Sequence, residues 1–278
     1  MTAEKLQQVS AGPIYSDPAL ASIPLEALQL NLLLENTQLQ LALRHNQEFV
    51  HLAVYHFPEN QAVAALRFLL SQEEWLRKNY SRVHIGLSVP ELTLVPGEFL
   101  DGAQADTLFD FNFSHPSSGR LYTDTLPDLA ANLLYRLPDA VDQLLRLHFP
   151  QATLQHGTTA LLKALPAENN EEALYVYVQP GQLQFLYLQG HKLKYFNLFR
   201  YVTGEDYCYH LMNVCNQLHL DREKIKVMLL GEVVRQSDVF QYAYKYIRQI
   251  GFGRRYTGAT YSPSLQMPEN FYYQLFAL

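Results

Sequence analysis

Hydrophobic and polar positions alternate with a period of two in two separate stretches of the chain, residues 28–57 and 174–199. A period of two is typical of a β-strand that buries one face. Each stretch is interrupted twice by residues that favour tight turns: Glu35-Asn36 and His45-Asn46 in the first, Pro180-Gly181 and Gly190-His191 in the second. Each stretch therefore predicts three consecutive strands joined by two short turns.

The two predicted three-strand stretches share one register. Glu35 and Pro180 are 145 positions apart, and so are His45 and Gly190. The same offset separates Gly86 from Gly231 further along the two copies. A constant offset at three places indicates an internal duplication.

Both copies continue with the same kinds of element. After Asn60, an expected capping residue, apolar positions in 61–78 recur at helical spacing, and they do so again after Thr203. A short apolar strand follows each helix, at 82–89 and at 225–231. The chain therefore contains a β-β-β-α-β unit twice.

The remaining segments complete two similar lobes. The sequence predicts a strand at 131–138, a helix at 138–148, a strand at 151–156, a short helix at 158–165, a helix capped by Ser237 that runs to Ile250, and a strand near 251–256. The polar and acidic segment 166–172 is the expected break between the lobes. We therefore expect an N-terminal tail at 1–24, a first lobe with its connecting elements at 25–165, and a second lobe at 170–278.

Period-two strands followed by a crossover helix and a buried strand predict an α/β protein built from mixed-sheet α+β lobes. A duplicated β-β-β-α-β unit resembles the actin-like ATPase superfamily, and the order of segments is similar to its bacterial pilus-assembly and cell-division members. The resemblance implies an actin-like ATPase, ribonuclease-H-like architecture.

Three short segments carry a narrower resemblance. They are TLVPGEFL at 93–100, LLYRLPDAVDQLLRLHFP at 133–150 followed by His156, and NFYYQLF at 270–276. With them, the chain resembles a domain-of-unknown-function family of Bacteroidetes proteins from about residue 25 to 278. This resemblance implies the actin-like fold and no known activity.

The superfamily resemblance also implies a phosphate site that the residues here do not match. Its ATPases hold phosphates in the first hairpin of each lobe with an Asp-x-Gly pattern, in which glycine lets backbone amides approach and aspartate positions the metal or water. The first hairpin, 30–40, contains neither residue, and the second, 175–185, contains Gly181 after a proline but no aspartate. Pro180-Gly181 is typical of an ordinary turn.

The adenosine side departs from the superfamily as well. Paired glycines are usual after the fourth strand of the second lobe, whereas here Gly231 is followed by Glu232. A carboxylate beside a nucleotide would add like-charge repulsion. We therefore expect that ATP with magnesium neither stabilises the protein nor is hydrolysed by it.

No other cluster identifies a reaction, so we expect no catalytic, cofactor-binding or metal-binding residues. His51 and His56, near His45, are an odd number of positions apart and so point to opposite faces of a strand. The carboxylates available for a two-metal nuclease lack the required spacing and are expected to be solvated in turns or loops: Glu35, Asp101, Asp106 and Asp110. Ser88 and Ser118 lack a nucleophile-elbow context, and the chain has no P-loop.

The two cysteines and the single tryptophan are expected to be structural. Cys208 and Cys215 fall in one expected helix, where a rise of 1.5 Å per residue separates them by about 10 Å, too far for a disulfide. Free cysteine is often buried, so both are expected in the core. Trp75 falls late in the first crossover helix and is expected to be partly buried.

Composition and charge narrow the class of protein. The chain is 48% hydrophobic and 17% charged, with a net charge of −6, which argues against disorder and against a strongly basic nucleic-acid binder. The first residues lack an apolar signal core, and no apolar run approaches the roughly 20 residues of a membrane span. We expect a cytoplasmic protein without a membrane span.

The two halves differ in the sign of their charge. Residues 1–145 have a net charge of −9, and residues 146–278 have a net charge of +3. The cations expected to gather on the second lobe are Lys192, Lys194, Arg200, Lys224, Lys226, Lys245, Arg248, Arg254 and Arg255. They have three possible interpretations: a solvated face attracted to the acidic lobe, a surface for an acidic protein partner, or an RNA-binding surface.

Two hypotheses of function remain. In the first, the protein is a non-catalytic, degenerate actin-like module that acts in protein–protein interaction, which the missing aspartates and glycines favour. The alternative is an atypical nucleotide-binding protein or phosphotransferase of the same superfamily.

Overall fold

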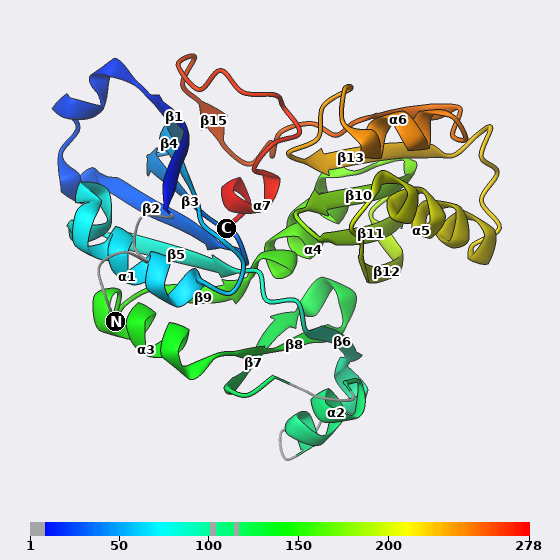
Figure 1. Cartoon of the computed structure of the whole chain (residues 1–278), viewed down its shortest axis with the longest axis horizontal. Helices are drawn as coiled ribbons and strands as arrows, with labels where there is room; N and C mark the ends of the chain where they lie inside the picture. The colour runs from blue at the N-terminus through cyan, green and yellow to red at the C-terminus, as the bar shows by residue number, and fades with distance from the viewer. Residues whose placement is uncertain (1–8, 101–103, 114–116) are drawn as a thin grey trace. The chain divides into compact units, whose positions relative to one another are not determined.

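The computed structural model describes residues 9–100, 104–113 and 117–278. The chain separates into two compact units, each drawn in Figure 1. Unit 1 comprises residues 1–163, 258–266 and 274–278, and unit 2 comprises residues 164–257 and 267–273. The lobe boundaries expected from the sequence, 25–165 and 170–278, stay a prediction.

Unit 1 is built on a seven-stranded mixed sheet. Its strands are β1 (Ser10–Ser16), β2 (Leu28–Leu34), β3 (Gln38–His45), β4 (Glu48–His56), β5 (Arg82–Leu87), β9 (Thr153–His156) and β15 (Thr260–Tyr261). The order is β1-β4-β3-β2-β5-β9, and β15 also pairs with β4. Strand β1 lies within the segment 1–24 that we interpreted as a tail, and it pairs antiparallel to β4.

Unit 2 is built on a five-stranded sheet with the matching order. Its strands are β10 (Glu172–Gln179), β11 (Gln182–Gln189), β12 (Lys192–Arg200), β13 (Lys226–Gly231) and β14 (Gln249–Phe252), in the order β12-β11-β10-β13-β14. Numbered along the chain within the unit, these strands have the order third, second, first, fourth, fifth. The strands β4-β3-β2-β5-β9 of unit 1 have the same order. The predicted duplication of strand order is confirmed.

The duplication extends to individual residue pairs. Leu33 of β2 lies opposite Gly86 of β5 in a parallel ladder, and Val178 of β10 lies opposite Gly231 of β13. Both members of the second pair are offset by 145 positions from the first. The register expected from the sequence is therefore the register of the sheets.

Each unit carries amphipathic helices against its sheet. In unit 1 they are α1 (Ala62–Gln72) and α3 (Asp139–His148), and in unit 2 they are α5 (Gly204–Gln217) and α6 (Asp238–Tyr244) (Figure 1). Thr203 caps α5 through a reciprocal pair of hydrogen bonds with Asp206. Cys208 and Cys215 are both buried on α5 as free thiols.

Helix α1 differs from its prediction at both ends. Helix α1 ends at Gln72 because Glu73 is extended, so Trp75 lies in a separate 3₁₀ helix, Glu74–Arg77. Asn60 does not cap α1; it has a left-handed φ of 63°, and Gln61 is the N-cap. Trp75 is half-buried beside His51 and Lys78, which confirms its expected partial burial.

The helix predicted to reach Ile250 stops at Tyr244. Ile250 instead lies in β14, paired in parallel with Val227 of β13, because a strand at this edge buries its side chain against the sheet. Conversely, helix α4 (Gly157–Glu168) continues past Leu165 through Pro166 into the segment that we expected as a break.

A smaller sheet within unit 1 has the order β6-β8-β7, formed by β6 (Leu92–Pro96), β7 (Arg120–Leu126) and β8 (Ala131–Leu137), beside the short helix α2 (Ala105–Phe111). Arg136 of β8 pairs with Asp106 and Asp110 of α2, each at 2.8 Å. Both carboxylates are exposed, as expected, but they lie on helix α2 and not in a turn or loop, and a neighbouring strand supplies their cation. Asp101 lies outside the described residues.

The C-terminal segment that carries the narrower resemblance contains α7 (Tyr273–Phe276). In unit 1, Asn31 of the buried strand β2 donates from its amide to the carbonyl of Leu275 at 3.0 Å. Phe276 packs against Phe49 and Tyr261. In the described part of the chain, no helix is both long and apolar enough to cross a membrane.

Candidate functional site

In the first hairpin of unit 1, between β2 and β3, two side chains hydrogen-bond each other across the turn. Glu35 follows β2 and is only 5% exposed, and its carboxylate accepts a hydrogen bond from the amide of Gln38. The expectation that Glu35 is solvated is wrong, because the tight β2–β3 turn folds its side chain against Gln38. A buried carboxylate at this turn repels a phosphate group.

The first hairpin of unit 2 is an ordinary tight turn. Pro180 and Gly181 connect β10 to β11, and Gly181 has a φ of 74°, which glycine adopts without strain. Behind the turn, the amide of Gln184 donates to the side-chain oxygen of Gln179 at 2.7 Å, and both side chains are buried.

Gly231, at the end of β13, is needed by the backbone. It has a φ of 92°, and a Cβ atom there would overlap the carbonyl oxygen of Val178. Asn270 donates from its side-chain amide to the carbonyls of Gly231 and Val233, at 2.8 and 2.9 Å. This glycine therefore holds the strand end and its connection to Asn270.

The histidines of the β4 region do not form a metal site. His51 is buried, hydrogen-bonds Ser16 Oγ through Nδ1 and packs on Trp75, and burial lowers its pKa to about 4. Among residues 9–100, 104–113 and 117–278, no group of three histidine, cysteine, aspartate or glutamate side chains is arranged to hold a metal ion.

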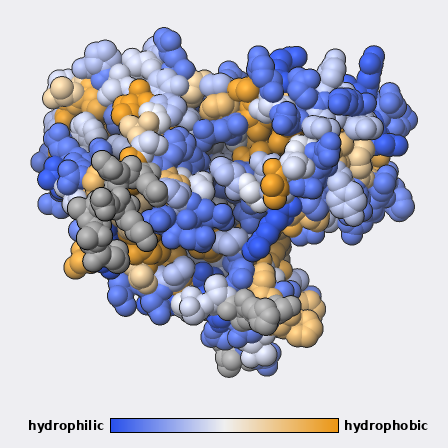
Figure 2. Space-filling view, viewed as in Figure 1, coloured by the Kyte–Doolittle hydropathy of each residue, from blue (hydrophilic) through white to orange (hydrophobic). Residues whose placement is uncertain are grey.

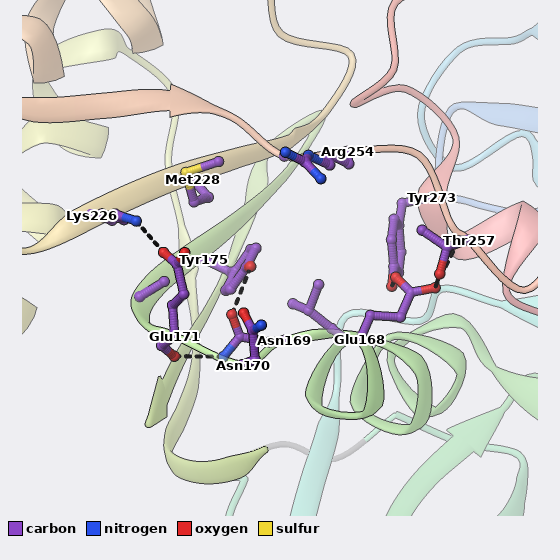
Figure 3. A pocket seen from close by; sticks show the side chains of 13 residues that line it. Glu168, Asn169, Asn170, Glu171, Tyr175, Lys226, Met228, Arg254, Thr257 and Tyr273 are labelled. Atoms are coloured by element: carbon purple, nitrogen blue, oxygen red, sulfur yellow. Dashed lines mark hydrogen bonds and ion pairs between the residues drawn. The ribbon is translucent and has the colours of Figure 1, made fainter. Parts of the chain in front are cut away.

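A pocket of about 320 Å³ lies within unit 2 (Figure 3). Its lining residues are on the face of the sheet opposite the core under α5 and α6. Period-two alternation produces the two faces. Leu174, Val176 and Val227 point into the core under the helices, whereas Tyr175 and Met228 point into the pocket. Tyr175 and Met228 are partners in the parallel β10–β13 ladder.

One wall of the pocket is the C-terminal end of α4. The carboxylate of Glu168 accepts three hydrogen bonds, from the backbone N–H and hydroxyl of Thr257 at 2.7 Å each and from the hydroxyl of Tyr273 at 2.6 Å. Burial first, and then the Glu168 charge, raise the pKa of Tyr273. Because its oxygens are already occupied by donors, Glu168 anchors the loop after β14 to α4.

The floor is held by the loop between α4 and β10. Asn169 is buried, accepts from the Tyr175 hydroxyl at 3.0 Å, and donates to the carbonyls of Glu171 and Gly190 at 2.7 and 2.6 Å. Burial, followed by the charges of Glu171 and Glu168, raises the pKa of Tyr175. Beside it, Lys226 forms an ion pair with Glu171.

Arg254 lies across the pocket from this floor (Figure 3). Its guanidinium makes no hydrogen bond or ion pair among the residues that the structure describes. Its positive charge partly opposes the rise in the pKa of Tyr175, and it adds to the lowering of the pKa of Glu171 that the hydrogen bond and charge of Lys226 mainly cause. Arg254 is thus a cation at the pocket without a bonded counter-ion in the described chain.

The sequence pointed to only part of this site. Lys226 and Arg254 belong to the expected set of second-lobe cations, but nothing in the sequence brought them together with Glu168, Tyr175 or Tyr273. The alternation of Tyr175 with the core residues Leu174 and Val176 was a usable signal, since it marks a second face of β10. The long-range approach of Tyr273 had no sequence signal.

Comparison with known proteins identifies the family. The family described as "Protein of unknown function (DUF3822)" matches residues 19–250. The chain belongs to the DUF3822 family. The Bacteroidetes domain-of-unknown-function family that its sequence resembles is thereby confirmed. Among curated proteins, no relative matches this chain.

Solved structures show the fold of this DUF3822 protein. It is similar to a Bacteroides thetaiotaomicron protein of actin-like ATPase fold and unknown function, with 17% identity, a TM-score of 0.75, and coverage of 91% of this chain and 97% of that one. It is also similar to a chain of the PilM–PilN type IV pilus biogenesis complex, with 14% identity, a TM-score of 0.57 and coverage of 91% and 98%. The expected actin-like architecture is confirmed.

Proposed function

We propose that this DUF3822 protein is a non-catalytic actin-like module that acts by binding another protein. The observation that carries the proposal is the buried carboxylate of Glu35 in the first hairpin, where ATPases of this fold hold phosphate. The second hairpin supports it, because Pro180 and Gly181 form a plain turn that has no aspartate for a metal.

The proposed partner surface is the basic edge of the unit 2 sheet, defined as Lys192, Lys194 and Arg200 on β12. All three are exposed, and none makes an ion pair with another described residue. Strand β12 is the last strand of its sheet, whereas the equivalent strand of unit 1, β4, is covered by β1 and β15. An open, basic edge fits an acidic partner that adds a strand.

The fold offers a precedent for such a role. A chain of similar fold is part of a solved complex named PilM–PilN. The face of unit 2 visible in Figure 2 is mostly hydrophilic, so a charge-based contact suits it better than an apolar one. We propose a cytoplasmic location with this role, with which the free thiols of Cys208 and Cys215 are compatible.

The loss of nucleotide binding is tested by thermal unfolding with ATP and magnesium. A ligand at a hundredfold excess over its Kd stabilises the native state by about 2.7 kcal/mol, equivalent to a rise of roughly 5 to 10 °C in Tm for a chain of this size. We expect no magnesium-dependent rise and no ATP hydrolysis. Tripolyphosphate is the matched control, since helix N-termini attract any polyanion weakly.

A rise of several degrees with ATP and magnesium, absent with tripolyphosphate, would overturn the proposal. It would favour the alternative, an atypical nucleotide-binding protein or phosphotransferase.

The partner surface is tested by co-purification from the native host. We expect an acidic protein, identified by mass spectrometry, to be retained by the wild type and lost with Lys192→Glu/Lys194→Glu. Arg222→Glu/Lys224→Glu, which changes the same net charge away from β12, should retain it. Equal retention by both variants would contradict the assigned edge.

A further inference from the structure

We propose that the pocket of unit 2 binds a small organic carboxylate with an apolar, preferably aromatic, body. This inference does not depend on the proposed protein partner, since the pocket is lined by other residues than Lys192, Lys194 and Arg200 of β12. The pocket volume of about 320 Å³ lies at the lower end of the range for small-molecule sites.

The charge of the ligand follows from the charges that line the pocket. Two carboxylates, Glu168 and Glu171, face two cations, Lys226 and Arg254, so the lining is neutral overall. Lys226 is paired with Glu171, and Glu168 is satisfied by Thr257 and Tyr273. Among the described lining residues, Arg254 is the cation without a bonded partner, and it can pair with one anionic group of a ligand.

The kind of anion follows from geometry and repulsion. A guanidinium presents two parallel N–H donors that match the two oxygens of a carboxylate. A phosphate monoester carries nearly two charges and would be repelled by the nearby carboxylates of Glu168 and Glu171. A monoanionic carboxylate therefore fits this pocket better than a phosphate.

The body of the ligand follows from the remaining surface. The rings of Tyr175 and Tyr273 and the thioether of Met228 line the pocket together with Leu165 and Ala173. Aromatic rings and thioethers both make favourable contacts with an aromatic ligand. Tyr273 is 1% exposed and bonded to Glu168, so this surface is already held in place before a ligand arrives.

The rigidity of the floor supports a preformed site. Asn169 ties the α4–β10 loop to Tyr175 and to the β11–β12 turn through Gly190. Glu168 ties the other wall to Thr257. Preformed walls lower the entropic cost of binding, because few side chains have to be ordered.

The test uses the full chain and three carboxylate probes: benzoate, 4-hydroxybenzoate and hexanoate, each paired with its neutral amide. Binding is followed by amide chemical shifts in two-dimensional NMR. We expect the acids to move the amides of 168–175, 226–228 and 254, with the aromatic acids stronger than hexanoate, and the neutral amides to move them far less.

Matched variants identify the cation. Arg254→Gln should weaken binding of the acids by about tenfold or more, because it removes a charge-assisted hydrogen bond to the carboxylate. Arg248→Gln, an exposed arginine of the same unit that does not line the pocket, should bind as the wild type does. Met228→Trp, which fills the pocket, should abolish binding while the amide spectrum outside the pocket stays folded.

Three outcomes would overturn the proposal. One is that none of the acids moves the pocket amides at millimolar concentration. Another is that Arg254→Gln binds the acids as tightly as Arg248→Gln does. The third is that an acidic peptide moves these amides while the free acids do not, which would assign the pocket to a protein partner.

Discussion

Gly231 lies opposite Val178 in the parallel pairing of β13 with β10, and its missing side chain leaves room for the Val178 carbonyl oxygen. The position also has a φ of 92°, a conformation that residues other than glycine rarely adopt. Strand geometry therefore requires this glycine, with no need for a nucleotide to explain it.

Replacing Gly231 with alanine should destabilise the fold by about 2 kcal/mol or more, from the overlap with Val178 and the unfavourable φ. Urea unfolding measures the loss. Gly251→Ala is the matched control in the neighbouring strand β14, where a Cβ atom has no atom within 4 Å, and it should stay within about 0.5 kcal/mol of the wild type. Equal stabilities for the two variants would contradict the assigned backbone role.

The stability of unit 1 should fall as the pH drops from about 6.5 towards 4. Burial lowers the pKa of both His156 and His51 to about 4, so the folded state disfavours their protonated forms. His156 accepts from the Thr158 N–H through Nδ1 and donates from Nε2 to the Val89 carbonyl, and protonation of Nδ1 removes the first bond.

The sign follows from the depressed pKa values. The unfolded histidines bind protons below about pH 6.5 while the folded ones do not, so the stabilisation is complete above pH 6.5 and is lost as the pH falls through the folded pKa. Each histidine contributes a slope of about 1.4 kcal/mol per pH unit in that window. Urea unfolding at pH 7.5, 6.0 and 5.0 should show this fall in the free energy of unfolding. The slope with pH should be smaller for His51→Gln than for the wild type, and it should equal the wild-type slope for His148→Gln, on the exposed side of α3.

Arg136 should hold helix α2 against the three-stranded sheet. Its guanidinium pairs with Asp106 and Asp110 and lies 4.9 Å from the centre of the Phe109 ring. Arg136→Ala should lower the local stability of α2 by about 1–2 kcal/mol, from the cation–π contact and the exposed ion pairs together. Hydrogen exchange of the 105–111 amides measures this local stability, and Arg136→Lys should show part of the wild-type protection. Unchanged protection in Arg136→Ala would contradict the role of Arg136 in holding α2.

The two cysteines should be unreactive in the native protein. Burial raises the pKa of Cys215 to about 11 and also raises that of Cys208, so little thiolate is present at pH 8. Iodoacetamide should label both only after unfolding in urea, as mass spectrometry would show. Rapid labelling of Cys215 in the folded protein would show that helix α5 is open to solvent.

The duplicated strands, their turns and their register were determined by the sequence alone. Alternation with a period of two depends only on neighbouring residues, and turn residues such as Pro180-Gly181 act locally, so the offset of 145 between Gly86 and Gly231 survives in the sheets. The start of helix α5 after Thr203 also followed from the sequence, and the cap that Thr203 forms is local, because its partner Asp206 is three residues away.

Only the tertiary structure decided which distant side chains meet. Arg136 of β8 pairs with Asp106 and Asp110 of α2. Ile250 lies in a strand and not in its predicted helix, because β13 offers a strand partner. The pocket joins Glu168 to Tyr273, more than a hundred positions apart, and sets Arg254 opposite Tyr175. Such contacts arise from packing between segments that have no shared local pattern, so hydrophobic periodicity and turn chemistry contain no information about them.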